Sequence, residues 1–156
     1  MPCLRKEELK MVESGAIVEY LEKEYPEPPL SLQDDEHIKV QSSFFPALAT
    51  FLKSPEFQAD LEANLLDQVG KLNDHLASKD TKYFAGNELT LVDFSLAPKL
   101  FHMMVTLEEL HPETLEKVKA NHEALNNYIA NMFEEEAFKA GAYDRSVVIW
   151  GWKKHQ

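Results

Sequence analysis

The segment from Thr90 to His102 constrains the fold of this 156-residue chain more than any other part of it. Thr90 followed three residues later by Asp93 is the pattern of a helix capping box, in which the two side chains satisfy free backbone amides of the first turn. The Asp93 carboxylate also places negative charge at the positive end of the helix dipole. The pattern predicts a central helix that is buried on most sides and interrupted at Pro98. Its apolar positions are Leu91, Phe94, Leu96, Ala97, Leu100 and Phe101.

Composition indicates a soluble, acidic, well-packed protein with room for one sizeable domain, or one domain plus a fragment. The hydrophobic content of 44%, with nine Phe and five Tyr, argues against disorder. No apolar run approaches the roughly twenty residues that span a bilayer. The net charge of −11 disfavours nucleic acid and anionic membranes as partners. The single cysteine, Cys3, excludes an internal disulfide and indicates a reducing compartment, which we take to be the cytoplasm.

Helical periodicity dominates the chain, and one proline-rich stretch interrupts it. Because glycine is scarce and strand-like alternation is nearly absent, we expect an all-α fold. Only residues 1–11 could pair as short strands. Ser14 is expected to cap a helix that stops before the linker, residues 26–32, whose prolines force an extended connector. The predicted division is therefore residues 1–25, the linker, and a helical domain over residues 33–156.

The expected helical domain carries successive apolar stripes. Residues 38–52 predict one helix kinked at Pro46, and His111 with Pro112 marks a turn or a new helix start. We expect Glu134 to Glu136 to form a solvated face, and the apolar tail 147–152 to pack back on the bundle. The clearest stripe comprises Phe57, Leu61, Leu65, Leu66, Val69, Leu72 and Leu76. A later stripe comprises Leu125, Tyr128, Ile129, Met132 and Phe133.

The capped helix resembles the core helix of the all-helical domain of soluble glutathione transferases. The Leu-Ala-Pro-Lys-Leu-Phe-His phrase, residues 96–102, is similar to the dehydroascorbate reductases of that superfamily, and chloride-intracellular-channel proteins share a related form. The resemblance covers nearly the whole chain. Residues 12–29 look like the last helix of the family's thioredoxin-like domain and the linker after it, and residues 50–54 and 148–152 are similar to two further stretches.

The resemblance implies an all-α bundle of the glutathione transferase C-terminal type, preceded by a partial thioredoxin-like segment of short strands plus one helix. It also implies that the family's nucleophile, in a Cys-Pro-Phe-Ser/Cys-type motif, belongs to a half-domain without a counterpart here. Cys3 lies beside the position of the family's cis-proline, Pro2, on a strand. It is not at a helix N-terminus, which would lower a thiol pKa. We therefore expect no catalytic residue in this sequence and a truncated form of such an enzyme.

Five residues correspond by resemblance to glutathione contacts. Glu13 and Ser14 resemble the acidic-Ser pair that holds the γ-glutamyl end, where free helix amides suit a carboxylate; an ordinary helix start would look the same. Met1 takes the place of the residue whose backbone pairs with the cysteinyl part. His102 and Trp152 match positions that line the ligand cleft, supplying a donor to an anion and a flat wall. Taken alone, His102 is better explained as a hydrogen-bonded polar residue at a helix edge, and Trp152 as core packing of the tail.

The resemblance implies glutathione-dependent reduction of dehydroascorbate, with glutathione as co-substrate. No metal is expected, because no histidine or carboxylate has metal-ligand spacing, and no phosphate loop or Ser-His-Asp phrase occurs. The alternative is a non-catalytic module for dimerisation or protein docking, through apolar area that an incomplete N-terminal region leaves uncovered. A channel-like relative is disfavoured by the lack of a bilayer-length run. A plastid location also stays open, since a transit peptide would lie in the absent segment.

Overall fold

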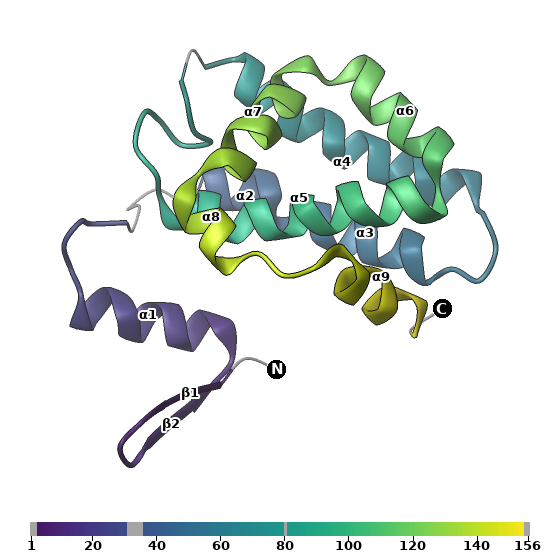
Figure 1. Cartoon of the computed structure of the whole chain (residues 1–156). Coiled ribbons are helices and arrows are strands. Elements are labelled where there is room, and N and C mark those ends of the chain that lie inside the picture. Colours follow the sequence, from purple (N-terminus) through teal and green to yellow (C-terminus); the bar gives the residue numbers. More distant parts are fainter. Residues whose placement is uncertain (1–2, 31–35, 80, 155–156) are drawn as a thin grey trace. The chain divides into compact units, whose positions relative to one another are not determined.

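The structure, a computed structural model, describes residues 3–30, 36–79 and 81–154. The chain separates into two compact units, residues 1–33 and residues 34–156, which we call the N-terminal unit and the helical unit (Figure 1). The first ends just after the proline-rich connector. The finer division into a remnant, a linker and a helical domain stays a prediction.

The N-terminal unit is a β-hairpin followed by one helix. Strands β1 (Cys3–Lys6) and β2 (Leu9–Val12) pair antiparallel, with Cys3 opposite Val12 and Lys6 opposite Leu9. Helix α1 (Ser14–Glu24) follows, and Lys6 Nζ reaches Glu24 Oε2 at 3.0 Å. The prediction that Ser14 caps this helix is wrong. Ser14 is its first residue, and Glu13 occupies the cap position without a side-chain hydrogen bond.

The connector is irregular from Tyr25 to Leu30, as its prolines predict, and its Glu27–Pro28 peptide bond is cis. The cis-proline position expected from the resemblance, Pro2, lies outside the described residues.

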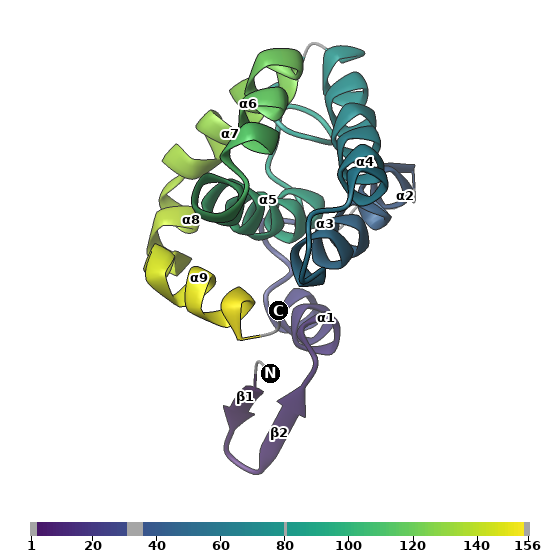
Figure 2. The ribbon, with the colours of Figure 1, turned by 90° about the vertical axis from the view of Figure 1, so that its right-hand side faces the viewer.

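The helical unit is an all-α bundle, as predicted. Its elements are α2 (Glu36–Ser42), α3 (Phe44–Lys53), α4 (Ala59–Ala77), α5 (Leu91–Leu110), α6 (Pro112–Asn121), α7 (Glu123–Glu134), α8 (Glu136–Gly141) and α9 (Arg145–Lys153). Figures 1 and 2 show α5 running through the bundle; it packs against α3, α6, α7 and α9, while α4 packs against α3 and α7. The largest fully buried side chains include Phe44, Phe51, Phe84, Leu65, Leu96, Leu100, Met103 and Leu125. None of the described helices combines the length and apolarity needed to cross a membrane.

Two predicted boundaries are wrong. The single helix expected over residues 38–52 is broken at Ser43, and Pro46 instead lies in the first turn of α3, where its missing N–H removes no helical bond. Phe57, expected in the α4 stripe, precedes that helix and is 59% exposed. The predicted interruption at Pro98 is also wrong, because Pro98 lies inside α5, which is helical from Leu91 to Leu110. The predicted start of α6 at Pro112 is confirmed.

The capping box at the start of α5 is confirmed and extends further than predicted. Asp93 is fully buried, and its Oδ2 accepts from the Thr90 N–H at 3.0 Å and from the Thr90 hydroxyl at 2.8 Å. Its Oδ1 accepts from the Phe84 N–H and from the Tyr128 hydroxyl, each at 2.9 Å. Burial beside this carboxylate raises the pKa of Tyr128. One carboxylate therefore joins α5, the preceding loop and α7.

Candidate functional site

His102 and Trp152, expected to line a ligand cleft, lie side by side in the helical unit. The Trp152 Nε1–H donates to His102 Nδ1 at 3.0 Å. Because an indole nitrogen can only donate, Nδ1 is the unprotonated acceptor, and the neutral imidazole carries its proton on Nε2. Nε2 lies 2.5 Å from the Tyr143 hydroxyl oxygen, so the His102 N–H donates to Tyr143. A directed chain of hydrogen bonds runs from Trp152 through His102 to Tyr143.

The surroundings of His102 and Tyr143 favour the uncharged forms of both side chains. Burial lowers the pKa of His102 and raises the pKa of Tyr143, so both groups are neutral near pH 7. The Phe45 ring stands edge-on to both partners, with centroids 6.4 Å from His102 and 6.2 Å from Trp152. The arrangement is a hydrogen-bonded aromatic cluster that can present a flat apolar wall and a hydroxyl donor.

Helix α9 positions Trp152 by packing against α5, which confirms the prediction that the apolar tail returns to the bundle. Val148 and Trp152 are its buried residues, while Asp144 caps its start by accepting from the Ser146 N–H at 2.8 Å. Arg145 and Lys153 also form ion pairs to glutamates of α5. Exposed pairs of this kind contribute little, so apolar burial holds α9 in place.

Lys99 lies one turn before His102 and is a residue that the sequence analysis quoted without assigning it a role. Its Nζ donates to Ser95 Oγ at 3.0 Å, and it has no acidic partner among the described residues. Burial lowers its pKa. Ser95, Lys99 and His102 share one side of α5, since they are spaced by four and three residues. A cation without a counter-ion among the described residues suits an anionic ligand group.

The other predicted contacts belong to the N-terminal unit. Glu13 and Ser14 are adjacent at the start of α1, and Glu13 has a positive φ of 75°, an uncommon conformation for a residue with a side chain. The first helical bond is from the Ile17 N–H to the Glu13 carbonyl, at 3.1 Å. The earlier amides of α1 therefore lack a helical acceptor. Met1 lies outside the described residues, and Cys3 is exposed on β1.

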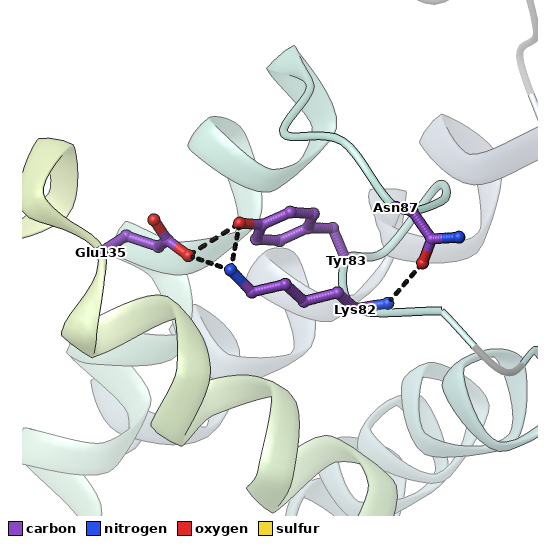
Figure 3. A network of polar contacts seen from close by, with 4 residues as sticks. All are labelled: Lys82, Tyr83, Asn87 and Glu135. Carbon is purple, nitrogen blue, oxygen red and sulfur yellow. Dashed lines mark hydrogen bonds and ion pairs between the residues drawn. The ribbon is translucent and has the colours of Figure 1, made fainter.

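A second polar cluster was missed by the sequence analysis. The expected solvated face of Glu134 to Glu136 is wrong for Glu135, which separates α7 from α8 and is partly buried. Its Oε1 accepts from Lys82 Nζ at 3.0 Å and from the Tyr83 hydroxyl at 2.8 Å (Figure 3). Asn87 Oδ1 accepts from the Lys82 N–H at 3.2 Å. This network fixes the loop before α5 to the α7–α8 junction.

Within the described ranges, no three histidines, cysteines or acidic residues are grouped so as to hold a metal ion.

Known proteins similar to this chain include two plant enzymes and an algal one. Residues 55–131 match the family described as glutathione S-transferase, C-terminal domain. Glutathione S-transferase DHAR2 of Arabidopsis thaliana is 34% identical over 98% of this chain and 70% of its own length. The chain belongs to the glutathione S-transferase superfamily, in its dehydroascorbate reductase branch.

The structural comparison places the fold in the same branch. The crystal structure of Chlamydomonas reinhardtii dehydroascorbate reductase superposes with a TM-score of 0.86 at 29% identity, over all of this chain and 73% of that one. This confirms the predicted superfamily fold, including the C-terminal-type bundle. Chloroplastic glutathione S-transferase DHAR3 of Arabidopsis thaliana is also 34% identical, over 98% of this chain and 57% of its own length. This member of the glutathione S-transferase superfamily thus spans 57% to 70% of the two curated relatives.

The stability of the helical unit is expected to fall as the pH is lowered from 7 toward 5. Burial lowers the pKa of His75, His102 and His111 below the ordinary histidine value. As the pH falls through about 6.5, these histidines become protonated in the unfolded chain but stay neutral in the folded chain. The stabilisation is therefore complete above that pH, and it is lost as the pH falls through the folded pKa values. Urea unfolding followed by circular dichroism at a series of pH values measures the effect.

A His75→Gln variant provides the control. It removes one of the three histidines whose pKa is lowered, so its free energy of unfolding should change less between pH 7 and pH 5. Carboxylates titrate at lower pH and do not confuse this window. An unfolding midpoint that stays constant from pH 7 to pH 5 would show that these histidines titrate normally.

Proposed function

We propose that this chain is a dehydroascorbate reductase-like protein that lacks the nucleophilic cysteine, and that it supports the glutathione-dependent reduction of dehydroascorbate to ascorbate when the thioredoxin-like domain is complete. The observation that carries the proposal is the bond between Trp152 and His102, which joins two candidate ligand residues from distant parts of the sequence. The identity to a reductase-branch relative over nearly the whole chain supports the same conclusion. In this reaction two glutathione thiols are oxidised to one disulfide, and the two electrons and two protons released reduce dehydroascorbate.

The proposed roles follow from the chemistry of each residue. Glu13 accepts the ammonium of glutathione, and the Ser14 hydroxyl with the first amides of α1 binds the γ-glutamyl carboxylate. The backbone of Met1 pairs with the cysteinyl part of glutathione. Trp152 and the neutral His102 form one wall of the ligand site.

Cys3 is not the attacking group in this proposal. It is the single cysteine of the sequence, and it is exposed on β1 without the helix N-terminus that stabilises a thiolate. The proposed compartment is the cytoplasm. A plastid is the other option, since one relative is named as chloroplastic.

A chimera tests this proposal. The segment that precedes the matched region in the Arabidopsis DHAR2 relative is joined to this chain, and ascorbate formation from dehydroascorbate and glutathione is followed spectrophotometrically. We expect no activity from the chain alone, no change on Cys3→Ser, and activity from the chimera that falls at least about ten-fold on Trp152→Ala. Activity of the chain alone that disappears on Cys3→Ser would overturn the assignment of Cys3. A folded but inactive chimera would overturn the proposed function.

The second candidate function is a non-catalytic module that docks a protein or a second copy of the chain. One observation favours it: in the described part of the N-terminal unit, α1 buries no residue, and Leu9, Val12, Val18 and Leu21 are 36% to 44% exposed. Light scattering after size-exclusion chromatography discriminates the two. A stable dimer of the chain, combined with an inactive chimera, supports the module.

A further inference from the structure

A small cavity lies between α5 and α8, and the sequence analysis assigned it no role. Its volume is about 160 Å³. The contributing residues of α5 lie on a different side of that helix from Ser95, Lys99 and His102, because they follow their own spacing of three and four residues. The cavity therefore opens on a different side of α5 from the candidate ligand face, and the bond between Tyr143 and His102 links the two. Its walls include Ala97, Pro98, Phe101, Ala137, Phe138 and Tyr143.

The size and shape of the cavity suit one aromatic ring. An apolar cavity of about 150 Å³ has room for one benzene ring. This cavity is open to solvent on one side, because Ala137, Ala142 and Tyr143 are exposed. Four aromatic rings line it, and the Phe101 centroid is 5.9 Å from that of Phe138 and 6.2 Å from that of Tyr143, both edge-on. Edge-to-face contact with such rings is a favoured packing geometry for a planar ligand.

The chemistry of the lining selects among aromatic ligands. The Tyr143 hydroxyl is the one polar side-chain group among the described lining residues, and none of them is charged. Its oxygen accepts the His102 N–H, so its own proton has no acceptor within the described part of the chain. A ligand that brings a carbonyl oxygen would pair this donor, whereas a carboxylate against the apolar lining would have no cation among the described lining residues to pair with.

We propose that this cavity binds an uncharged, single-ring aromatic compound that carries a carbonyl acceptor, and that Tyr143 donates to that oxygen. The ligand ring lies in the cavity against the Phe101, Phe138 and Tyr143 rings, which already contact one another edge-on. The site requires neither glutathione nor a thiolate, so it is independent of the proposed reductase function.

Three probes of similar shape test the ligand class. Acetophenone carries the carbonyl, isopropylbenzene replaces it with an apolar group, and benzoate replaces it with a charge. Each is titrated into the full chain with carbon-13-labelled alanine methyls. Saturable shifts are expected at Ala97, Ala137 and Ala142, which line the cavity, and not at Ala140. Acetophenone should bind about five-fold more tightly than isopropylbenzene, the ratio expected for one neutral hydrogen bond. Benzoate should produce no saturable shift.

Two pairs of measurements on variants locate the site. Ala137→Leu fills the cavity and should weaken acetophenone binding at least about ten-fold. Ala140→Leu, the same change at an exposed non-lining position of α8, should change it less than about two-fold. Tyr143→Phe should remove the preference for acetophenone over isopropylbenzene while leaving isopropylbenzene binding unchanged.

Any one of three results would overturn the proposal. The lining alanines show no saturable shifts, all three probes bind equally, or the two leucine variants lose equal affinity for acetophenone. The three-probe comparison on the unmodified chain decides it even if a variant fails to fold.

Discussion

Replacing Asp93 by alanine is expected to lower the free energy of unfolding of the helical unit by about 3–5 kcal/mol. The change removes the acceptor of four donors at a fully buried position: the Thr90 and Phe84 N–H groups and the Thr90 and Tyr128 hydroxyls. An unpaired buried donor costs about 1–3 kcal/mol, and the Thr90 hydroxyl can turn to another partner more readily than the other three donors. Since domains of this size are stable by about 5–15 kcal/mol, the variant should be close to unfolding. Urea unfolding monitored by circular dichroism measures the loss.

Asp67→Ala is the matched control for Asp93→Ala. Asp67 lies on α4, its side chain is 59% exposed, and it pairs with Lys71 one turn away at 2.7 Å. Such a pair contributes about 0.3–0.5 kcal/mol, so this variant should unfold almost as the original chain does. Equal unfolding free energies for the two aspartate variants would show that the buried network does not stabilise the bundle.

The Asp93 network also shows what could be predicted from the sequence. The bonds to Thr90 were predicted because both partners lie within one helical turn, where spacing fixes geometry. The bonds to Phe84 and Tyr128 come from 9 and 35 positions away, and only the packing of α5 against α7 and the preceding loop brings them together. Spacing carries no information on such contacts.

The candidate site follows the same rule. His102 and Trp152 are 50 positions apart, and they were expected to share a cleft from resemblance to the reductases, not from their spacing. Tyr143 has no periodic neighbours and matches no quoted phrase, so nothing pointed to its bond with His102. The Glu135 prediction failed for a related reason: three successive acidic residues indicate solvent exposure, but a break between helices turns one of them toward Tyr83.

Replacing Phe84 by alanine should cost about 3–5 kcal/mol, the second large effect that the structure predicts. Phe84 lies in a loop without helix or strand, yet it is fully buried. Its ring stacks on His75 with centroids 4.5 Å apart, and it meets Tyr128 edge-on at 6.0 Å. Alanine keeps the backbone bonds of residue 84 to Asp93 and His75, so the loss reports on ring packing alone.

Phe57→Ala is the control for Phe84→Ala, because it removes the same ring at a position that is 59% exposed. It should cost less than about 1 kcal/mol. A second readout separates packing from a general loss of order. Burial lowers the pKa of His75, and the cavity left by Phe84→Ala admits water, so the pKa of His75 should rise toward its ordinary value. Proton NMR of the imidazole signals measures this rise. If His75 titrates as before and both phenylalanine variants unfold alike, the Phe84 ring does not anchor the loop, and polar contacts such as those of Asp93 and Glu135 hold it in place.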